Sequence, residues 1–459
     1  MRLRRQLIVS AIALTGLGCA VGTTGSIPVR LASAPVDPGH PGETGTINAT
    51  FKLTWRPTDP AALGAIDDLV DDGTHGISRA QMSTVVADGN RTLRWKSGCP
   101  AGNNAMDAMD AKVRLGAWCF TGDDAYNTWY PQGVGISRTS TLNGVLLSWY
   151  HRNSAGETDM TRITVGARPS AGTNGSYRSV LLAVPTTTDS GRLAMQDVQP
   201  VRADLSTNAV SDLGLHAGGI AVAGNHLYVA DTAGGFRVFN LSKPYQVATG
   251  KTGLGLDAAD NRFYARGAKY ALFEEGRYAY DTSAGTCKPD TQAPDGPGRN
   301  LCFSTVSVDN SYPTPGLVSS EYRRTAGVVA GRPVRVVRWP LNADGSLRAT
   351  GGVVTSTAVY GTYTPRIQGV AAHYNSAQRT MVYYNTSYTD GNGVVRPGTV
   401  YSDHGGRNAW SIAGTRGAEA FGYDENNTDG HRLWSVTEHP NLRMLYWVYR
   451  DEVQPAADS

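Results

Sequence analysis

The sequence predicts an all-β protein folded as a β-propeller. The first observation is its composition, because the 459 residues include 54 glycines and few stretches have the periodicity of an amphipathic helix. The second is the stretch 215–241, in which short apolar segments at 219–222, 227–230 and 236–240 are separated by Gly-Asn and Gly-Gly turns. The third is the recurrence of this pattern along the chain, which is typical of repeated four-stranded units packed radially.

The N-terminus is predicted to be an export signal. Arg2, Arg4 and Arg5 precede an apolar run at 7–17 that is too short to span a membrane. Residues 18–20 and 32–34 both offer small residues for cleavage, so residues 1–34 are assigned to signal and leader. A twin-arginine signal is one alternative, and a lipid anchor at Cys19 is another, which would tether the protein outside the cell.

The mature chain is predicted to be nearly neutral. Residues 1–34 contain four arginines and no acidic residue, so their removal changes the formal charge from +3 to −1. A protein without a strong positive field is not expected to bind nucleic acid or anionic membranes. We expect a secreted monomer with no membrane span.

Four cysteines remain once Cys19 is set aside. Their clustering predicts two local disulfides, Cys99–Cys119 and Cys287–Cys302, although four cysteines allow three pairings. Export to an oxidising compartment favours disulfides, and the spacings do not match a zinc site.

Residues 35–128 are predicted to be an N-terminal segment that carries the first disulfide. After a leader at 35–48, an alternating strand occupies 50–55, and one or two short helices are expected within 59–87, where Ser78 resembles a helix cap. The propeller is assigned to 129–453.

Five units account for this region, with six as the alternative because their spacing is uneven. The predicted strands are 130–137, 145–150, 161–165 and 178–184 in the first unit; 219–222, 227–230 and 236–240 in the second; 269–273, 303–308, 317–322 and 334–339 in the third; 366–372, 381–385 and 398–401 in the fourth; and 417–423, 433–438 and 444–449 in the fifth. The fifth unit lacks an outer strand, which we expect the segment near 51–55 to supply, closing the ring. A β-sandwich is the alternative fold, but it does not explain why units open with Gln-Gly-Val.

The residues from about Trp129 to Val448 resemble a group of secreted actinobacterial β-propeller-like proteins. The resemblance rests on the order Tyr-Pro-Gln-Gly-Val, Val-Leu-Leu-Ser-Trp-Tyr, His-Ala-Gly-Gly-Ile and Leu-Tyr-Val-Ala-Asp-Thr, followed by Gly-Phe-Arg-Val-Phe. It implies a propeller and export, and it implies no particular reaction.

Polar residues at the unit openings are predicted to line one mouth of the central channel. Aligned openings place Gln132, Gly218, Gln368 and Glu419 at equivalent positions, with His216 two residues before its unit's position. Such residues are candidates for binding a small ligand or a metal, with calcium in the channel as the candidate ion. The alternative is that they only satisfy backbone groups around a wet channel.

Carboxylates near strand ends are the candidates for catalysis. Asp231, Glu321 and Glu438 have this placement, and a pair facing across the channel would suit glycoside hydrolysis. With Glu419 and His216, Asp231 and Glu321 form the candidate catalytic set. No Gly-x-Ser-x-Gly precedes a helix and no phosphate-binding loop is present, which disfavours a serine hydrolase or a nucleotide enzyme.

Clusters of aromatic residues offer a binding function instead. Trp129, Tyr130, Trp149 and Tyr150 gather in the first unit, with other Tyr and Trp residues in the fourth and fifth. Exposed rings stack on sugars or anchor proteins, whereas buried ones only pack between blades. The sequence therefore predicts an exported binding or scaffold protein for a polysaccharide, cell-wall glycan or extracellular protein. The alternative is an extracellular, glycosidase-like hydrolase with its site at the channel mouth.

Overall fold

The computed structural model describes residues 41–188, 192–197, 217–232, 234–280, 301–309, 314–325, 328, 333–374, 380–403, 409–424 and 430–454. Cys19, His216 and Cys287 lie outside these residues, so the predictions that depend on them stay predictions. None of the helices in the described ranges is long and apolar enough to cross a membrane.

Most of the described strands belong to five groups of antiparallel strands, which we number in chain order. Group 1 contains β6 (Trp129–Arg138), β7 (Asn143–Arg152), β8 (Thr158–Gly166), β9 (Gly175–Thr187) and β10 (Leu193–Asp197). Group 2 contains β11 (Ile220–Ala223), β12 (His226–Asp231), β13 (Gly235–Asn240), β17 (Tyr270–Ala279), β2 (Lys52–Pro57), β22 (Val353–Thr355) and β21 (Ala349–Thr350).

The other three groups follow the same plan. Group 3 contains β18 (Phe303–Asp309), β19 (Gly316–Glu321), β20 (Val334–Pro340), β23 (Ala358–Thr362) and β1 (Thr44–Thr46). Group 4 contains β24 (Ile367–Tyr374), β25 (Thr380–Thr386), β27 (Val395–Asp403) and β28 (Trp410–Arg416), and the short β26 (Tyr388–Thr389) also pairs with β27. Group 5 contains β29 (Gly422–Asp424), β30 (Arg432–Val436), β31 (Met444–Tyr449), β5 (Leu115–Phe120) and β4 (Arg91–Trp95).

The remaining elements lie at the periphery. They are α1 (Pro60–Asp72), α2 (Met82–Ala87), β3 (Ser78–Arg79), β14 (Tyr245–Gln246), β15 (Leu254–Asp257), β16 (Arg262–Ala265) and the single 3₁₀ turns Lys96–Gly98, Gly122–Ala125 and Arg450–Val453.

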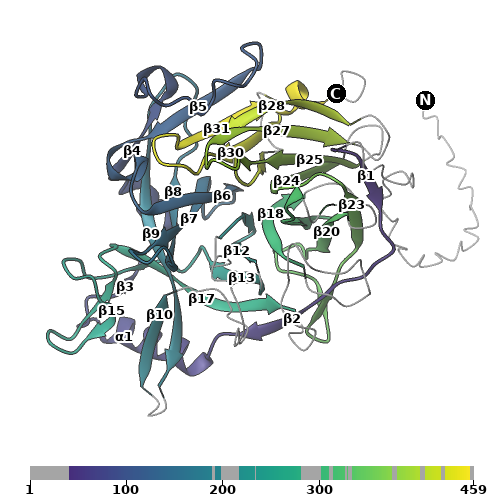
Figure 1. Ribbon diagram of the computed structural model, residues 1–459. Coiled ribbons are helices and arrows are strands. Elements are labelled where there is room, and N and C mark those ends of the chain that lie inside the picture. The colour runs from purple at the N-terminus through teal and green to yellow at the C-terminus, as the bar shows by residue number, and fades with distance from the viewer. Residues whose placement is uncertain are drawn as a thin grey trace, which may run out of the picture.

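The groups follow one another around a common centre, where their first strands meet (Figure 1). The Ala420 N–H before β29 donates to the Gln132 carbonyl of β6 at 3.0 Å, so group 5 closes onto group 1. The Ser304 hydroxyl of β18 donates to the Ile367 carbonyl of β24 at 2.7 Å. The fold is therefore propeller-like, as the sequence predicts.

Glycines at the strand openings permit this close approach. A Cβ on Gly219 would lie 2.3 Å from the Val306 nitrogen, and one on Gly369 would lie 2.7 Å from the Phe421 nitrogen. Both neighbours are backbone atoms that cannot move aside cheaply, so only glycine fits where one first strand crosses the next. This explains the Gly in the recurring Gln-Gly-Val openings.

Five hydrophobic clusters fill the spaces between successive groups. The cluster between groups 5 and 1 contains Trp118, Trp149, Trp434 and Trp447, with the Trp118 and Trp434 rings stacked at 6.0 Å. Corresponding clusters join groups 1 and 2, 2 and 3, 3 and 4, and 4 and 5. Each group therefore buries both faces against its neighbours, which a single four-stranded sheet could not do alone.

Two of the strand assignments made from sequence are wrong. Residues 51–55 were expected to complete group 5, but β2 pairs with β17 and β22 in group 2, while β5 pairs with β31 (Figure 1). The reason is burial: Trp118 and Cys119 of β5 point into the clusters on its two sides, whereas only Leu53 of β2 is buried. The closing strand does come from the N-terminal segment.

The second error concerns residues 269–273, which were assigned to the third unit. Residues 270–273 instead begin β17, the fourth strand of group 2, and β23 is the fourth strand of group 3. Helices α1 and α2 do lie within 59–87. Asp59 caps α1 by accepting from Ala61 N–H at 2.9 Å, whereas Ser78 lies in β3 and caps neither helix.

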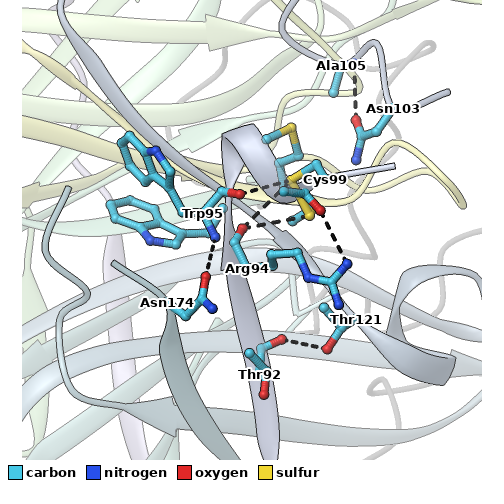
Figure 2. Close-up of a disulfide and its surroundings, with 12 residues drawn as sticks. Thr92, Arg94, Trp95, Cys99, Asn103, Ala105, Thr121 and Asn174 are labelled. Atoms are coloured by element: carbon cyan, nitrogen blue, oxygen red, sulfur yellow. Dashed lines mark hydrogen bonds between the residues drawn. A yellow bond between two sulfur atoms is a disulfide. The ribbon is translucent and has the colours of Figure 1, made fainter. Parts of the chain in front are cut away.

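The disulfide Cys99–Cys119 is confirmed. It links the turn after β4 to β5, with a Cα–Cα distance of 5.8 Å. Figure 2 shows the same turn held by Asn174, which accepts from Trp95 N–H at 2.9 Å, and by Arg94, which donates to the Gly98 carbonyl at 3.2 Å. Cys302 is buried, and its predicted partner Cys287 is outside the described residues.

Replacing both Cys99 and Cys119 with serine should lower the free energy of unfolding by about 3 kcal/mol. The two cysteines are separated by 20 residues, and the disulfide restricts the unfolded chain by closing a loop of that length. Guanidinium chloride unfolding under non-reducing conditions measures the change. Ser97→Ala, an exposed substitution in the same turn, is the control. Equal midpoints for the double variant and the control would contradict the prediction.

Candidate functional site

The residues predicted to line the channel mouth, where the structure describes them, lie at the openings of neighbouring groups. Gln132 is buried on β6, Gln368 is half-buried on β24, and Glu419 is buried just before β29. A Cβ on Gly369 would lie 2.9 Å from the Glu419 carbonyl oxygen, so these openings touch. Gly218 abuts the Ser304 carbonyl of the next group. The repeat alignment therefore identified structurally equivalent positions, and whether they bind a ligand stays a prediction.

Glu419 is the most unusual of them electrostatically. Its side chain is 1% exposed, and neither carboxylate oxygen has a hydrogen-bond partner when both are treated as acceptors. Burial, followed by the charge and hydrogen-bonding proximity of Glu438, raises the pKa of Glu419 well above its ordinary value. Because two carboxylates can only accept, a proton on Glu419 supplies the donor that the pair lacks.

Glu438 is the other member of this carboxyl pair. Its Oε1 accepts from the Tyr150 hydroxyl at 2.9 Å, and its carbonyl oxygen accepts from Arg443 Nε at 3.0 Å. Burial lowers the pKa of Arg152, but the neighbouring Tyr150 and Glu438 have the larger combined effect, and the pKa of this guanidinium is raised. Burial lowers the pKa of Arg443 to about 10, and the negative charge of Glu438 is among the groups that limit this shift. Glu438 thus interacts with one tyrosine and two arginines.

Aromatic rings stand beside the carboxyl pair. Tyr130 and Tyr150 stack at 5.2 Å with an interplanar angle of 14°, and the Arg152 guanidinium lies 5.1 Å and 5.4 Å from their centroids. Tyr150 is buried, whereas Tyr130 and the preceding Trp129 are half-buried and Arg152 is exposed. We call Tyr130, Arg152 and Glu438 the mouth surface. Trp129, the neighbour of Tyr130 along β6, instead packs against His151 and the Arg162 guanidinium.

Asp231 and Glu321 lie at strand ends, as predicted, but both are buried in ion pairs. Asp231 pairs with Arg237 at 3.0 Å, and Glu321 accepts from Arg335 Nε at 2.7 Å. Burial favours a protonated Glu321, yet the neighbouring Arg335 outweighs it and lowers the pKa of this carboxyl. Such pairs suit a structural role better than proton transfer. Within the described ranges no group of three or more His, Cys, Asp or Glu side chains could hold a metal ion. Calcium stays a prediction, and the two guanidinium groups near Glu438 oppose a further cation there.

The partnership of Glu438 was not foreseen. The sequence placed Glu438 at a strand end and Tyr150 in an aromatic cluster, yet the two are 288 residues apart and come from the last and first groups. The only available signal was that each is the last residue of the second predicted strand of its unit, 145–150 and 433–438.

Comparisons with known proteins add little to this geometry. No model of a known protein family matches the sequence, and no curated protein matches it. Among solved structures, one similar chain comes from a study of the GH130 family of mannoside phosphorylases, which contains glycoside hydrolases that target β-1,2 mannosidic linkages in Candida mannan. It has 10% identity, a TM-score of 0.31, and coverage of 81% of this chain and 96% of that one. Another is the PQQ-bound aldose sugar dehydrogenase from Streptomyces coelicolor, with 13% identity, a TM-score of 0.27, and coverage of 73% and 98%. Scores this low support no inference about function.

Proposed function

We propose that this protein is an exported, five-bladed propeller that binds a glycan on its mouth surface. The signal-like N-terminus and the disulfide support export, and each of the five strand groups would form one blade. The observation that carries the binding function is the mouth surface itself: the half-buried ring of Tyr130, stacked on Tyr150, next to Arg152 and Glu438.

The chemistry of these groups matches that of a sugar. The face of a pyranose ring is apolar enough to pack on Tyr or Trp, while its hydroxyls need donors and acceptors at the rim. Arg152 supplies donors and Glu438 supplies acceptor oxygens, and both are held in place by Tyr150. Because Tyr130 is already stacked on Tyr150, little conformational freedom is lost on binding.

The mouth surface fits a hydrolase less well. Paired glycosidase carboxyls lie roughly 5–10 Å apart, with the substrate between them. Glu419 instead lies within hydrogen-bonding reach of Glu438, and both of its carboxylate oxygens are buried. Asp231 and Glu321 are engaged by arginines. A glycosidase remains the competing function, and one experiment separates the two.

Purified mature protein should bind one or more members of an array of polysaccharides and cell-wall fragments, without releasing soluble sugar. Tyr130→Ala should weaken binding of the best array member roughly tenfold or more, because an aromatic side chain contributes about 1.5 kcal/mol or more when it is covered. Isothermal titration calorimetry measures the affinity, and reducing-end analysis measures product.

Trp410→Ala is the matched control, because Trp410 is an aromatic residue 47% exposed on β28 of group 4. It should bind as the wild type does. Product release that disappears in Glu438→Gln would replace the binding function with hydrolysis. Equal affinities for Tyr130→Ala and the wild type would overturn the mouth surface as the site.

A further inference from the structure

Three arginines stand in line across adjacent strands of group 2. In the pairing of β13 with β17, Arg237 is opposite Arg277, and in the pairing of β17 with β2, Arg277 is opposite Arg56. We call these three residues the arginine row. Like charges directly opposite one another destabilise a sheet, so the row has an energetic cost that needs an explanation.

Only one end of the arginine row is neutralised. Arg237 pairs with Asp231 at 3.0 Å and with Glu274 at 2.6 Å. Neither Arg277 nor Arg56 makes a side-chain hydrogen bond or ion pair with any residue that the structure describes. Burial and the charge of Arg237 lower the pKa of Arg277 from its usual value. Glu274 and Asp231 oppose this shift, and Arg56 adds a smaller lowering. The three arginines of the row share two carboxylates, Asp231 and Glu274, so one positive charge is unmatched.

The arginine row opens into a pocket of about 740 Å³ formed by β2, β9, β10, β13 and β17. The acidic residues that line the pocket have other partners. Glu274 pairs with Arg237, Asp197 pairs with Arg266 at 2.6 Å, and Asp59 accepts from Ala61 N–H while capping α1. None of these carboxylates forms an ion pair with Arg277 or Arg56, so both guanidinium groups are available to bind a ligand.

Thr58, two residues after Arg56, also lines this pocket. Its hydroxyl oxygen is enclosed by the protein and makes no hydrogen bond within the described residues. Because that oxygen has almost no accessible surface, the ligand groups that the pocket offers are the guanidinium groups of the arginine row.

We propose that the arginine row is an oxyanion-binding site, which takes the carboxylate, phosphate or sulfate group of a small polar molecule. The fork of a guanidinium matches two oxygens of such a group, and the anion removes the repulsion between Arg277 and Arg56. The volume of the pocket suits a ligand the size of an acidic monosaccharide or disaccharide. This site is separate from the mouth surface and does not depend on the proposed glycan function.

The test is calorimetric titration of the mature protein with inorganic phosphate, sulfate and glucuronate, with glucose as the neutral probe, in a buffer free of other oxyanions. At least one of the three anions should bind, and glucose should not. Arg277→Gln should weaken that binding roughly tenfold or more, because it removes a charged fork from the centre of the row. The bound anion should also raise the melting temperature of the wild type, and Arg277→Gln should abolish this increase.

Two further variants keep the test decisive. Arg56→Gln changes the exposed end of the row and should also weaken anion binding, so it serves if Arg277→Gln does not fold. Arg348→Gln replaces an exposed arginine outside the pocket and should bind as the wild type does. No binding of any anion at millimolar concentrations, equal binding of glucose, or unchanged binding in both row variants would overturn the proposal. Tyr130→Ala should leave anion binding intact, so the two proposed sites fail or succeed separately.

Discussion

Glu321→Ala is expected to lower the free energy of unfolding by about 3–5 kcal/mol, because it leaves buried positive charge without a counter-ion. Arg335 and Arg323 are 1% and 2% exposed, and both contact the Glu321 carboxylate. Arg335 donates to both carboxylate oxygens, and its backbone N–H donates to Oε2 at 3.1 Å. Chemical denaturation at neutral pH measures the loss.

The effect should depend on pH with a definite sign. The folded-state pKa of Glu321 is lowered, so its contribution is present above the ordinary pKa near 4.5 and is lost as the pH falls through the folded value. The difference between wild type and Glu321→Ala should therefore shrink in acid.

Glu275→Ala is the matched control for Glu321→Ala. Glu275 pairs at 3.0 Å with Lys243, whose side chain is 53% exposed, and exposed pairs of this kind contribute about 0–1 kcal/mol. A loss for Glu321→Ala no larger than that of the control would show that the Glu321 pair is not needed for stability.

Glu419→Gln is expected to stabilise the protein at neutral and alkaline pH. The folded-state pKa of Glu419 is raised, so its contribution is fully present below 4.5 and is lost as the pH rises towards the folded value. Each pH unit in that window costs the wild type about 1.4 kcal/mol, since the unfolded chain ionises freely and the buried carboxyl does not. Glutamine is neutral at every pH and can still donate to Glu438.

Melting temperatures measured from acid to alkaline pH test this expectation. Wild type and Glu419→Gln should have similar stability near pH 4.5, and the variant should become progressively more stable above it. Glu275→Gln, which changes a half-buried surface carboxylate, should follow the wild type. Parallel curves for Glu419→Gln and wild type would mean that Glu419 is already ionised and that the carboxyl pair does not share a proton.

The sequence by itself determined the strands that form the inner part of each group. Residues 219–222, 227–230 and 236–240 were predicted within one residue or so of β11, β12 and β13, because alternation and Gly-Asn turns are local signals. The disulfide Cys99–Cys119 followed from proximity along the chain. The repeat also predicted that Gln132, Gln368 and Glu419 occupy the openings of their units, and the structure places them at or just before the first strands of groups 1, 4 and 5.

Only the tertiary structure decided which outer strand completes which group. The alternation of β2 is a clear strand signal, whereas β5 was not predicted as a strand, and the partners of both depend on which faces become buried by distant residues. The carboxyl pair and the arginine row likewise form only through contacts between residues that are distant in the sequence. Tyr150 meets Glu438 only when the last group closes onto the first, and Arg56, Arg237 and Arg277 align only when three strands from separate parts of the chain adopt one register. Local patterns specify strands, whereas contacts between groups depend on how the ring closes.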